Sequence, residues 1–135
     1  MTIFVDASAL IAMIVGEPEA DSLTDRLEAD RQRLCSAISL WETVAGLCRS
    51  HTFSPISARD HVQRFLDVAG IAFVAIGERE FVLALDAYAQ FGKGRHPAAL
   101  NMGDCFAYAC AKAHRAALLF KGDDFPKTDV ATFGE

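Results

Sequence analysis

Short apolar runs alternate with longer amphipathic stretches along the whole chain, and this alternation restricts the fold more than any other feature. We expect strands at 2–6, 33–38, 71–76 and 117–121, and a short edge strand near 129–132. We expect helices at about 7–15, 19–31, 40–50, 57–69, 78–91 and 103–114. This order predicts an α/β domain with a mostly parallel central sheet, flanked by helices on both faces because crossovers between parallel strands are right-handed.

The composition predicts a single domain spanning residues 1–135. Hydrophobic residues make up 52% of the 135 residues, which is enough for a sizeable core. No internal repeat, low-complexity segment or linker divides the chain. The amino terminus has no basic leader region, and its apolar stretch at 7–16 is too short to span a bilayer. We therefore expect no association with a membrane.

The cysteines indicate a reducing compartment. The four of them show no CxxC pair and no zinc-type spacing with the four histidines; they are Cys35, Cys48, Cys105 and Cys110. We expect reduced and mostly buried thiols, and hence a cytoplasmic protein.

Acidic residues stand where the expected strands and helices would bring them together. Asp6 closes the first apolar run, and Asp123 and Asp124 follow the run at 117–120. Glu42 and Asp104 fall in the first turns of helices that are expected to start at the same edge of the sheet. Open parallel sheets bind ligands at the carboxyl edge, where the strand order reverses. One fold therefore gathers all of these acids.

Such a cluster calls for neutralisation by protons or cations. Two carboxylates ~5 Å apart repel each other by roughly 3 kcal/mol at an effective dielectric of about 20. Mg²⁺ and Mn²⁺ prefer hard oxygen ligands, and Mg²⁺ uses few protein carboxylates while it keeps several waters. We interpret the acids as a divalent-metal site.

Each acid also has a local explanation as a helix cap or a turn residue. Asp6 can cap the helix that follows it, and Asp123 with Asp124 after a glycine is an ordinary turn composition. Two capping boxes are also possible, at Ser39–Glu42 and at Asn101–Asp104. Taken singly, the local explanation is the stronger one, and only the joint pattern favours a site.

A net charge of −5 argues against a broad basic surface for nucleic acid. A polyanionic substrate would have to be received locally, and the best candidate is the loop Lys93-Gly94-Arg95-His96. Positive charge is added around the last helix and strand by Lys112, Arg115 and Lys121. The alternative for the loop is an ordinary solvated turn.

Aromatic and histidine side chains give weaker signals. Trp41 stands next to Glu42 and could stack on a base, but a place in the core or in an interface is favoured. Tyr88 and Tyr108 lie on helical stripes and are expected in the core. None of the histidines has a defined catalytic partner.

Four segments of the chain are characteristic in their residues: IFVDASALIAMIVGEPEA, SLWETV, FGKGRHPAALNMGDCFAYACAKAH and LLFKGDDFPKTDV. Together they resemble the PIN-domain ribonucleases, specifically the VapC toxins of bacterial toxin–antitoxin systems. The resemblance covers nearly the whole chain. The last two segments together are specific to one VapC subgroup, whereas D-x-S-A-L alone would be weaker.

The resemblance implies cleavage of RNA by a water molecule that Mg²⁺ or Mn²⁺ activates. Asp6 and Asp104 match the principal metal ligands, and Glu42 matches the helix-borne acid. Asp124 is preferred to Asp123 as the fourth acid, although the T-x-D motif of many PIN domains is missing here. Ser8 matches the hydroxyl residue that supports the site. With this activity, the RNA backbone would be positioned by Lys93, Arg95, His96 and Lys121.

The resemblance also implies a co-expressed VapB-type antitoxin, whose carboxy-terminal segment lies in a groove and brings an arginine to the acids, and a homodimer. The helices at 7–15 and 19–31 are candidate dimer surfaces. Two other functions stay open. One is a non-catalytic PIN-fold module that binds RNA or an antitoxin. The other is a receiver-type phosphoacceptor domain, which is disfavoured because Asp6 stands alone after its strand and Gly77 follows the third strand.

Overall fold

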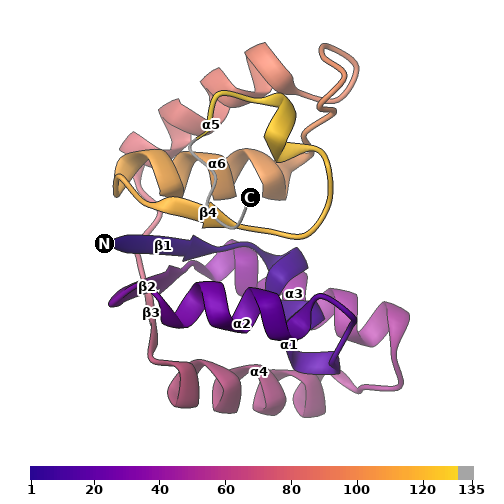
Figure 1. Ribbon diagram of the computed structural model, residues 1–135. Coiled ribbons are helices and arrows are strands. Elements are labelled where there is room, and N and C mark those ends of the chain that lie inside the picture. The colour runs from indigo at the N-terminus through magenta and orange to yellow at the C-terminus, as the bar shows by residue number, and fades with distance from the viewer. Residues whose placement is uncertain (131–135) are drawn as a thin grey trace.

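The computed structural model describes residues 1–130. Within them, four strands form one sheet in which every neighbouring pair is parallel (Figure 1). The strands are β1 (Thr2–Val5), β2 (Gln32–Cys35), β3 (Ile71–Phe73) and β4 (Ala117–Leu119), in the spatial order β3-β2-β1-β4. The predicted α/β class with a parallel sheet is confirmed.

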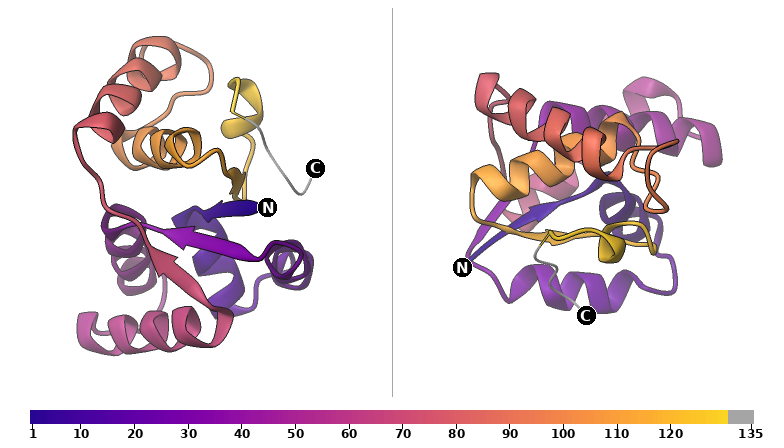
Figure 2. Two further views of the ribbon diagram at one scale, coloured as in Figure 1. Left: turned by 90° about the vertical axis from the view of Figure 1, so that its left-hand side faces the viewer. Right: turned by 90° about the horizontal axis from the view of Figure 1, so that it is seen from above.

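Helices cover both faces of the sheet (Figure 2). One face carries α1 (Ala7–Val15), α2 (Ala20–Glu28), α3 (Ala37–Ser50) and α4 (Pro55–Ala69), and the other carries α5 (Glu78–Phe91) and α6 (Met102–Ala113). A short 3₁₀ helix, η1 (Phe125–Lys127), follows β4. No helix in the described part of the chain is long and apolar enough to cross a bilayer.

The strand alternation explains why there are two cores. Ile3 and Val5 of β1 point into the cluster formed with α1 to α4, and Phe4 points into the cluster formed with α5 and α6. Phe4 lies in register with Leu34 on one side and Leu118 on the other. All three of these side chains are almost completely buried, so this row anchors α6 to the sheet.

Two of the expected strands are shorter than predicted, and a helix cap explains the end of β2. β2 was expected to reach residue 38 but ends at Cys35, because Ser36 is the cap of α3 and exchanges hydrogen bonds with Ser39. The expected capping box of Ser39 with Glu42 is therefore wrong. β3 covers 71–73 rather than 71–76, and most of its short length is exposed. α4 begins earlier than expected, because Ser54 rather than Ser57 caps it.

The predicted edge strand near 129–132 is not formed at 129 and 130, and its remaining residues lie outside the described part. Trp41 was expected to be buried in the core or in an interface, yet 72% of it is exposed in the single chain. Tyr88 is 44% exposed and not in the core, whereas Tyr108 is buried as predicted. All four cysteines are free, and three of them are buried.

The strand order places one edge of the sheet in position for a site. The chain builds from β1 to β2 and β3 on one side and then returns to place β4 on the other side of β1. The carboxyl ends of β1 and β4 thus meet at the point where strand order reverses, which is the usual ligand-binding position of an open parallel sheet. The backbone N–H of Asp6 donates to the carbonyl of Leu119 at 2.9 Å and holds the two ends together.

Candidate active site

Asp6 lies at the base of this edge, between β1 and α1, and only 5% of it is exposed. Its Oδ2 accepts hydrogen bonds from the Ser8 backbone N–H at 3.0 Å and from Ser8 Oγ at 2.6 Å. Burial raises the pKa of Asp6, and the hydrogen bonds from Ser8 partly oppose that rise. Asp6 is thus both the cap of α1 and a buried carboxylate at the switch point.

Asp104 comes from the first turn of α6, as predicted. It forms the expected capping box with Asn101, whose Oδ1 accepts from the Asp104 N–H at 2.8 Å and whose N–H donates to Asp104 Oδ2 at 3.1 Å. Burial and, to a smaller extent, the charges of Asp6 and Asp124 raise the pKa of Asp104 to about 6, while the hydrogen bond from the Asn101 backbone opposes the rise. Asp104 is therefore both a helix-capping residue and a member of the acidic cluster.

Glu42 reaches the cluster from α3, one turn later than predicted, because α3 begins at Ala37. Burial and, to a smaller extent, the charges of Asp6 and Asp104 raise its pKa to about 7, and Arg49 on the same helix opposes the rise. The Glu42 carboxylate lies directly against Gly103, where any side chain would overlap it. The sequence analysis did not single out either residue. The packing of α3 against α6 identifies Gly103, and the charge that acts on Glu42 along α3 identifies Arg49.

The fourth acid comes from the loop between β4 and η1. Gly122 has a φ of +117°, a conformation that favours glycine, and it turns the chain toward Asp123 and Asp124. Both carboxylates are exposed. Asp124 raises the pKa of Asp104, whereas Asp123 is not among the charges that do so. The structure therefore brings Asp6, Glu42, Asp104 and Asp124 into electrostatic contact.

The donor set fits a hard divalent cation. Among residues 1–130, no three His, Cys, Asp or Glu side chains already stand in the geometry of a metal centre. The gathered donors are nevertheless all carboxylates, the ligand type of Mg²⁺ and Mn²⁺, and Mg²⁺ keeps several waters and needs few protein ligands. The charge of Asp6 raises the pKa values of both Glu42 and Asp104, so a cation would relieve the repulsion within the cluster.

The basic loop has two exposed cations, Lys93 and Arg95. The Arg95 guanidinium lies 5.1 Å from the centre of the Tyr88 ring. His96 is partly buried: its Nδ1 accepts from the Ala98 N–H at 3.0 Å, and its ring packs edge-on against an aromatic ring of α5. His96 thus holds the loop in shape.

Lys121, which was also expected to contact RNA, is engaged in ion pairs. Its Nζ lies 2.9 Å from Glu17 Oε1 and 3.6 Å from Glu19 Oε2, both in the turn between α1 and α2. Its backbone N–H donates to Ser8 Oγ at 2.9 Å. The backbone of Lys121 therefore contacts Ser8, the residue that hydrogen-bonds to Asp6.

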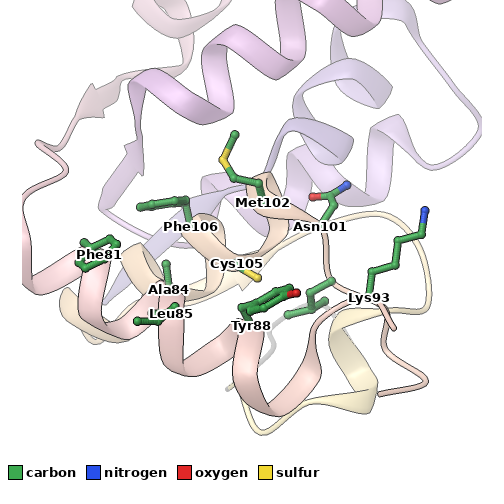
Figure 3. Close-up of a pocket in the computed structure, with 10 residues that line it drawn as sticks. Phe81, Ala84, Leu85, Tyr88, Lys93, Asn101, Met102, Cys105 and Phe106 are labelled. Atoms are coloured by element: carbon green, nitrogen blue, oxygen red, sulfur yellow. The ribbon is translucent and has the colours of Figure 1, made fainter. Parts of the chain in front are cut away.

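Two apolar hollows lie along the helices that carry Asp104 and Glu42. The first, of about 270 Å³, lies between α5 and α6, with Lys93 and Asn101 at one end (Figure 3). Its rim on α5 includes Phe81 and Leu85, each about half exposed. The second, of about 540 Å³, lies between α3 and α4 beside the exposed Trp41. Neither α1 nor α2 has a comparably exposed large apolar side chain, so the expected dimer helices bury their apolar faces in the core.

Comparison with known proteins agrees with this architecture. The PIN domain family matches residues 3–131. VapC ribonuclease Mb0640 of Mycobacterium bovis is 42% identical over 128 residues, covering 95% of both chains. VapC ribonuclease R02377 of Rhizobium meliloti is 39% identical, covering 94% of this chain and 98% of its own.

This chain belongs to the VapC family of PIN-domain ribonucleases. Solved structures agree with the VapC fold at much lower sequence identity. The Mycobacterium tuberculosis toxin VapC20, described as cleaving the sarcin–ricin loop, has a TM-score of 0.70 at 13% identity and covers 96% of both chains. VapBC-1 of nontypeable Haemophilus influenzae has a TM-score of 0.65 at 14% identity, covering 87% of this chain.

Proposed function

We propose that this VapC-family protein is the toxin of a toxin–antitoxin pair and cleaves RNA internally with the help of Mg²⁺ or Mn²⁺. The observation that carries the proposal is the convergence of four carboxylates from the end of β1, from α3, from α6 and from the loop after β4. The charges of Asp6 and Asp104 raise the pKa of Glu42, and the charges of Asp6 and Asp124 raise the pKa of Asp104. A bound divalent cation would offset this repulsion with the acids ionised, as metal-assisted cleavage requires.

Asp6 and Asp104 would hold the metal, and Glu42 and Asp124 would complete its surroundings or orient the attacking water. Ser8 keeps the Asp6 carboxylate in place by donating twice to one of its oxygens. Gly103 leaves room for the Glu42 carboxylate beside the first turn of α6. A bound divalent cation would supply two effects, a lower pKa for the attacking water and stabilisation of charge on the scissile phosphate.

The RNA backbone would be received by Lys93 and Arg95. Both are exposed, and their loop leads directly into Asn101, the cap that orients Asp104. Contacts of this kind position the substrate without reading its sequence. With a net charge of −5, such local contacts have to offset the overall repulsion between protein and RNA.

We further propose a VapB-type antitoxin as partner, a toxin homodimer and a cytoplasmic location. The two apolar hollows, with half-exposed side chains on α5 and the exposed Trp41, offer surface that a protein partner would bury. An arginine from the antitoxin would fit the carboxylate cluster by bidentate pairing.

Purified protein freed of antitoxin and metal tests the proposal. Mn²⁺ should raise its melting temperature, because the ion binds the folded state, and should start cleavage of total RNA at defined positions. Asp104→Asn, which keeps the shape of the side chain, should lose both effects. RNA left intact by the wild type at millimolar Mn²⁺ would contradict the catalytic proposal.

The competing hypothesis is a PIN fold that only binds RNA or an antitoxin. It gives no reason to gather four carboxylates, which repel a polyanion. A melting shift with Mn²⁺ but no cleavage of any RNA would favour it.

A further inference from the structure

The ion pairs of Lys121 tie the loop after β4 to the turn between α1 and α2. Glu17 lies in that turn with its backbone fixed at both ends, since its N–H donates to Ala12 and its carbonyl accepts from Ala20. Glu19 follows two residues later, and its Oε1 is buried without a hydrogen bond among the described residues. Lys121 therefore provides the neutralising charge for two carboxylates that sit on a fixed turn.

The same residue contacts the acidic cluster through its backbone. The Lys121 N–H donates to Ser8 Oγ, and Ser8 Oγ donates to Asp6 Oδ2. A hydroxyl has one proton, so the Lys121 N–H occupies its acceptor side and leaves that proton for Asp6. The position of the Lys121 backbone thus decides how the Asp6 carboxylate is held.

The loop also delivers the fourth acid. Only Gly122 and Asp123 separate Lys121 from Asp124, and Gly122 holds the turn with its positive φ. Fixing Lys121 at one end therefore restricts where the exposed Asp124 can lie relative to Asp104.

We propose that Lys121 is a positioning residue, clamped by Glu17 and Glu19, that holds Asp6 and Asp124 in their places in the acidic cluster. The charges favour this role over a contact with RNA. Two glutamates surround one ammonium group, so the local charge is negative and repels phosphate. A phosphate at Lys121 would also have to compete with Glu17, whose Oε1 lies 2.9 Å from the Lys121 Nζ.

The clamp is the pair of ion pairs that Lys121 forms with Glu17 and Glu19. Hydrogen exchange tests it without reference to activity. The double variant Glu17→Gln/Glu19→Gln removes both carboxylates and keeps their shape, and Asp21→Asn/Glu28→Gln is a control with the same charge change at exposed positions of α2. The clamp predicts that the Lys121 amide exchanges about fivefold faster in the first variant than in the control, because local opening becomes easier. Equal exchange in the two variants would overturn the clamp.

The catalytic consequence rests on the proposed function and is read from kinetics. The clamp predicts that Glu17→Gln/Glu19→Gln lowers kcat for RNA by about tenfold relative to the control, with KM unchanged, because only the placement of the carboxylates is affected. If Lys121 instead binds phosphate, freeing it should tighten RNA binding and steepen the salt dependence, measured in the inactive Asp104→Asn background.

An unchanged kcat, or tighter RNA binding with a steeper salt slope than in the control, would therefore overturn the positioning role. Failure of the wild type to cleave RNA would overturn the proposed function instead, and the exchange measurement would still decide the clamp.

Discussion

Replacing Glu42 by glutamine should stabilise the metal-free protein at pH 8. Burial and the neighbouring acids raise the pKa of Glu42 from 4.5 to about 7, so its ionised form is disfavoured in the folded state. Each tenfold change in an acid constant corresponds to about 1.4 kcal/mol, which sets an upper limit of about 3 kcal/mol above pH 7. Glu42 is partly exposed, and solvent screening reduces the expected gain to about 1–2 kcal/mol.

The direction of the pH dependence follows from the raised pKa. Below pH 4.5 the carboxyl group is protonated in both the folded and the unfolded state and contributes nothing. Between pH 4.5 and about 7 the folded state holds the proton that the unfolded state has lost, so the wild-type free energy of unfolding falls as the pH rises. Glu42→Gln removes this decrease in the free energy of unfolding. Asp104, whose pKa is raised to about 6, causes a similar decrease that remains in both proteins.

The assay is urea unfolding in EDTA at several pH values from 5 to 8. The stability of Glu42→Gln relative to the wild type should grow with pH, and the control Glu28→Gln, at an exposed position of α2, should show no such growth. Mn²⁺ should then stabilise the wild type more than the variant. A difference that is the same at pH 5 and pH 8, or absent at both, would refute the electrostatic coupling of Glu42 to the cluster.

Other substitutions separate the remaining roles. Asp124→Asn should lower RNA cleavage at least about tenfold and Asp123→Asn only slightly, because of these two residues Asp124 is the one whose charge raises the pKa of Asp104; equal losses in initial rate would argue against this choice. Lys93→Ala with Arg95→Ala should weaken RNA binding and reduce the salt slope by about 2, because two phosphate contacts are lost; an unchanged slope in binding titrations would identify an ordinary solvated loop. Gly103→Ala should displace the Glu42 carboxylate and slow cleavage while circular dichroism shows an intact fold, because the overlap is with the movable end of a side chain; full activity would show that the position of Glu42 is not needed.

Local patterns predicted the elements and two of the acids well. Short continuous apolar runs locate β1 and β4, because both faces of these strands are buried. Amphipathic stretches locate the helices, because burial on one face of a helix imposes its period. Asp6 and Asp104 follow from the same local rules, since the end of a strand and the first turn of a helix can be recognised within a few residues. The parallel sheet then follows from the alternation, and with it the edge where these two acids meet.

Packing between segments that are distant in the sequence decided the other contacts of the site. Glu42 joins the cluster because α3 starts at Ala37 and packs against Gly103, a contact between residues 61 positions apart in the sequence that no local pattern encodes. The partners of Lys121 are likewise a fixed turn more than a hundred residues earlier in the chain, so its role could not be read from its neighbours. The sequence by itself determined which residues carry charge and which elements carry them. Only the tertiary structure decided which charges face one another, because charge interactions depend on distances in space that chain folding sets.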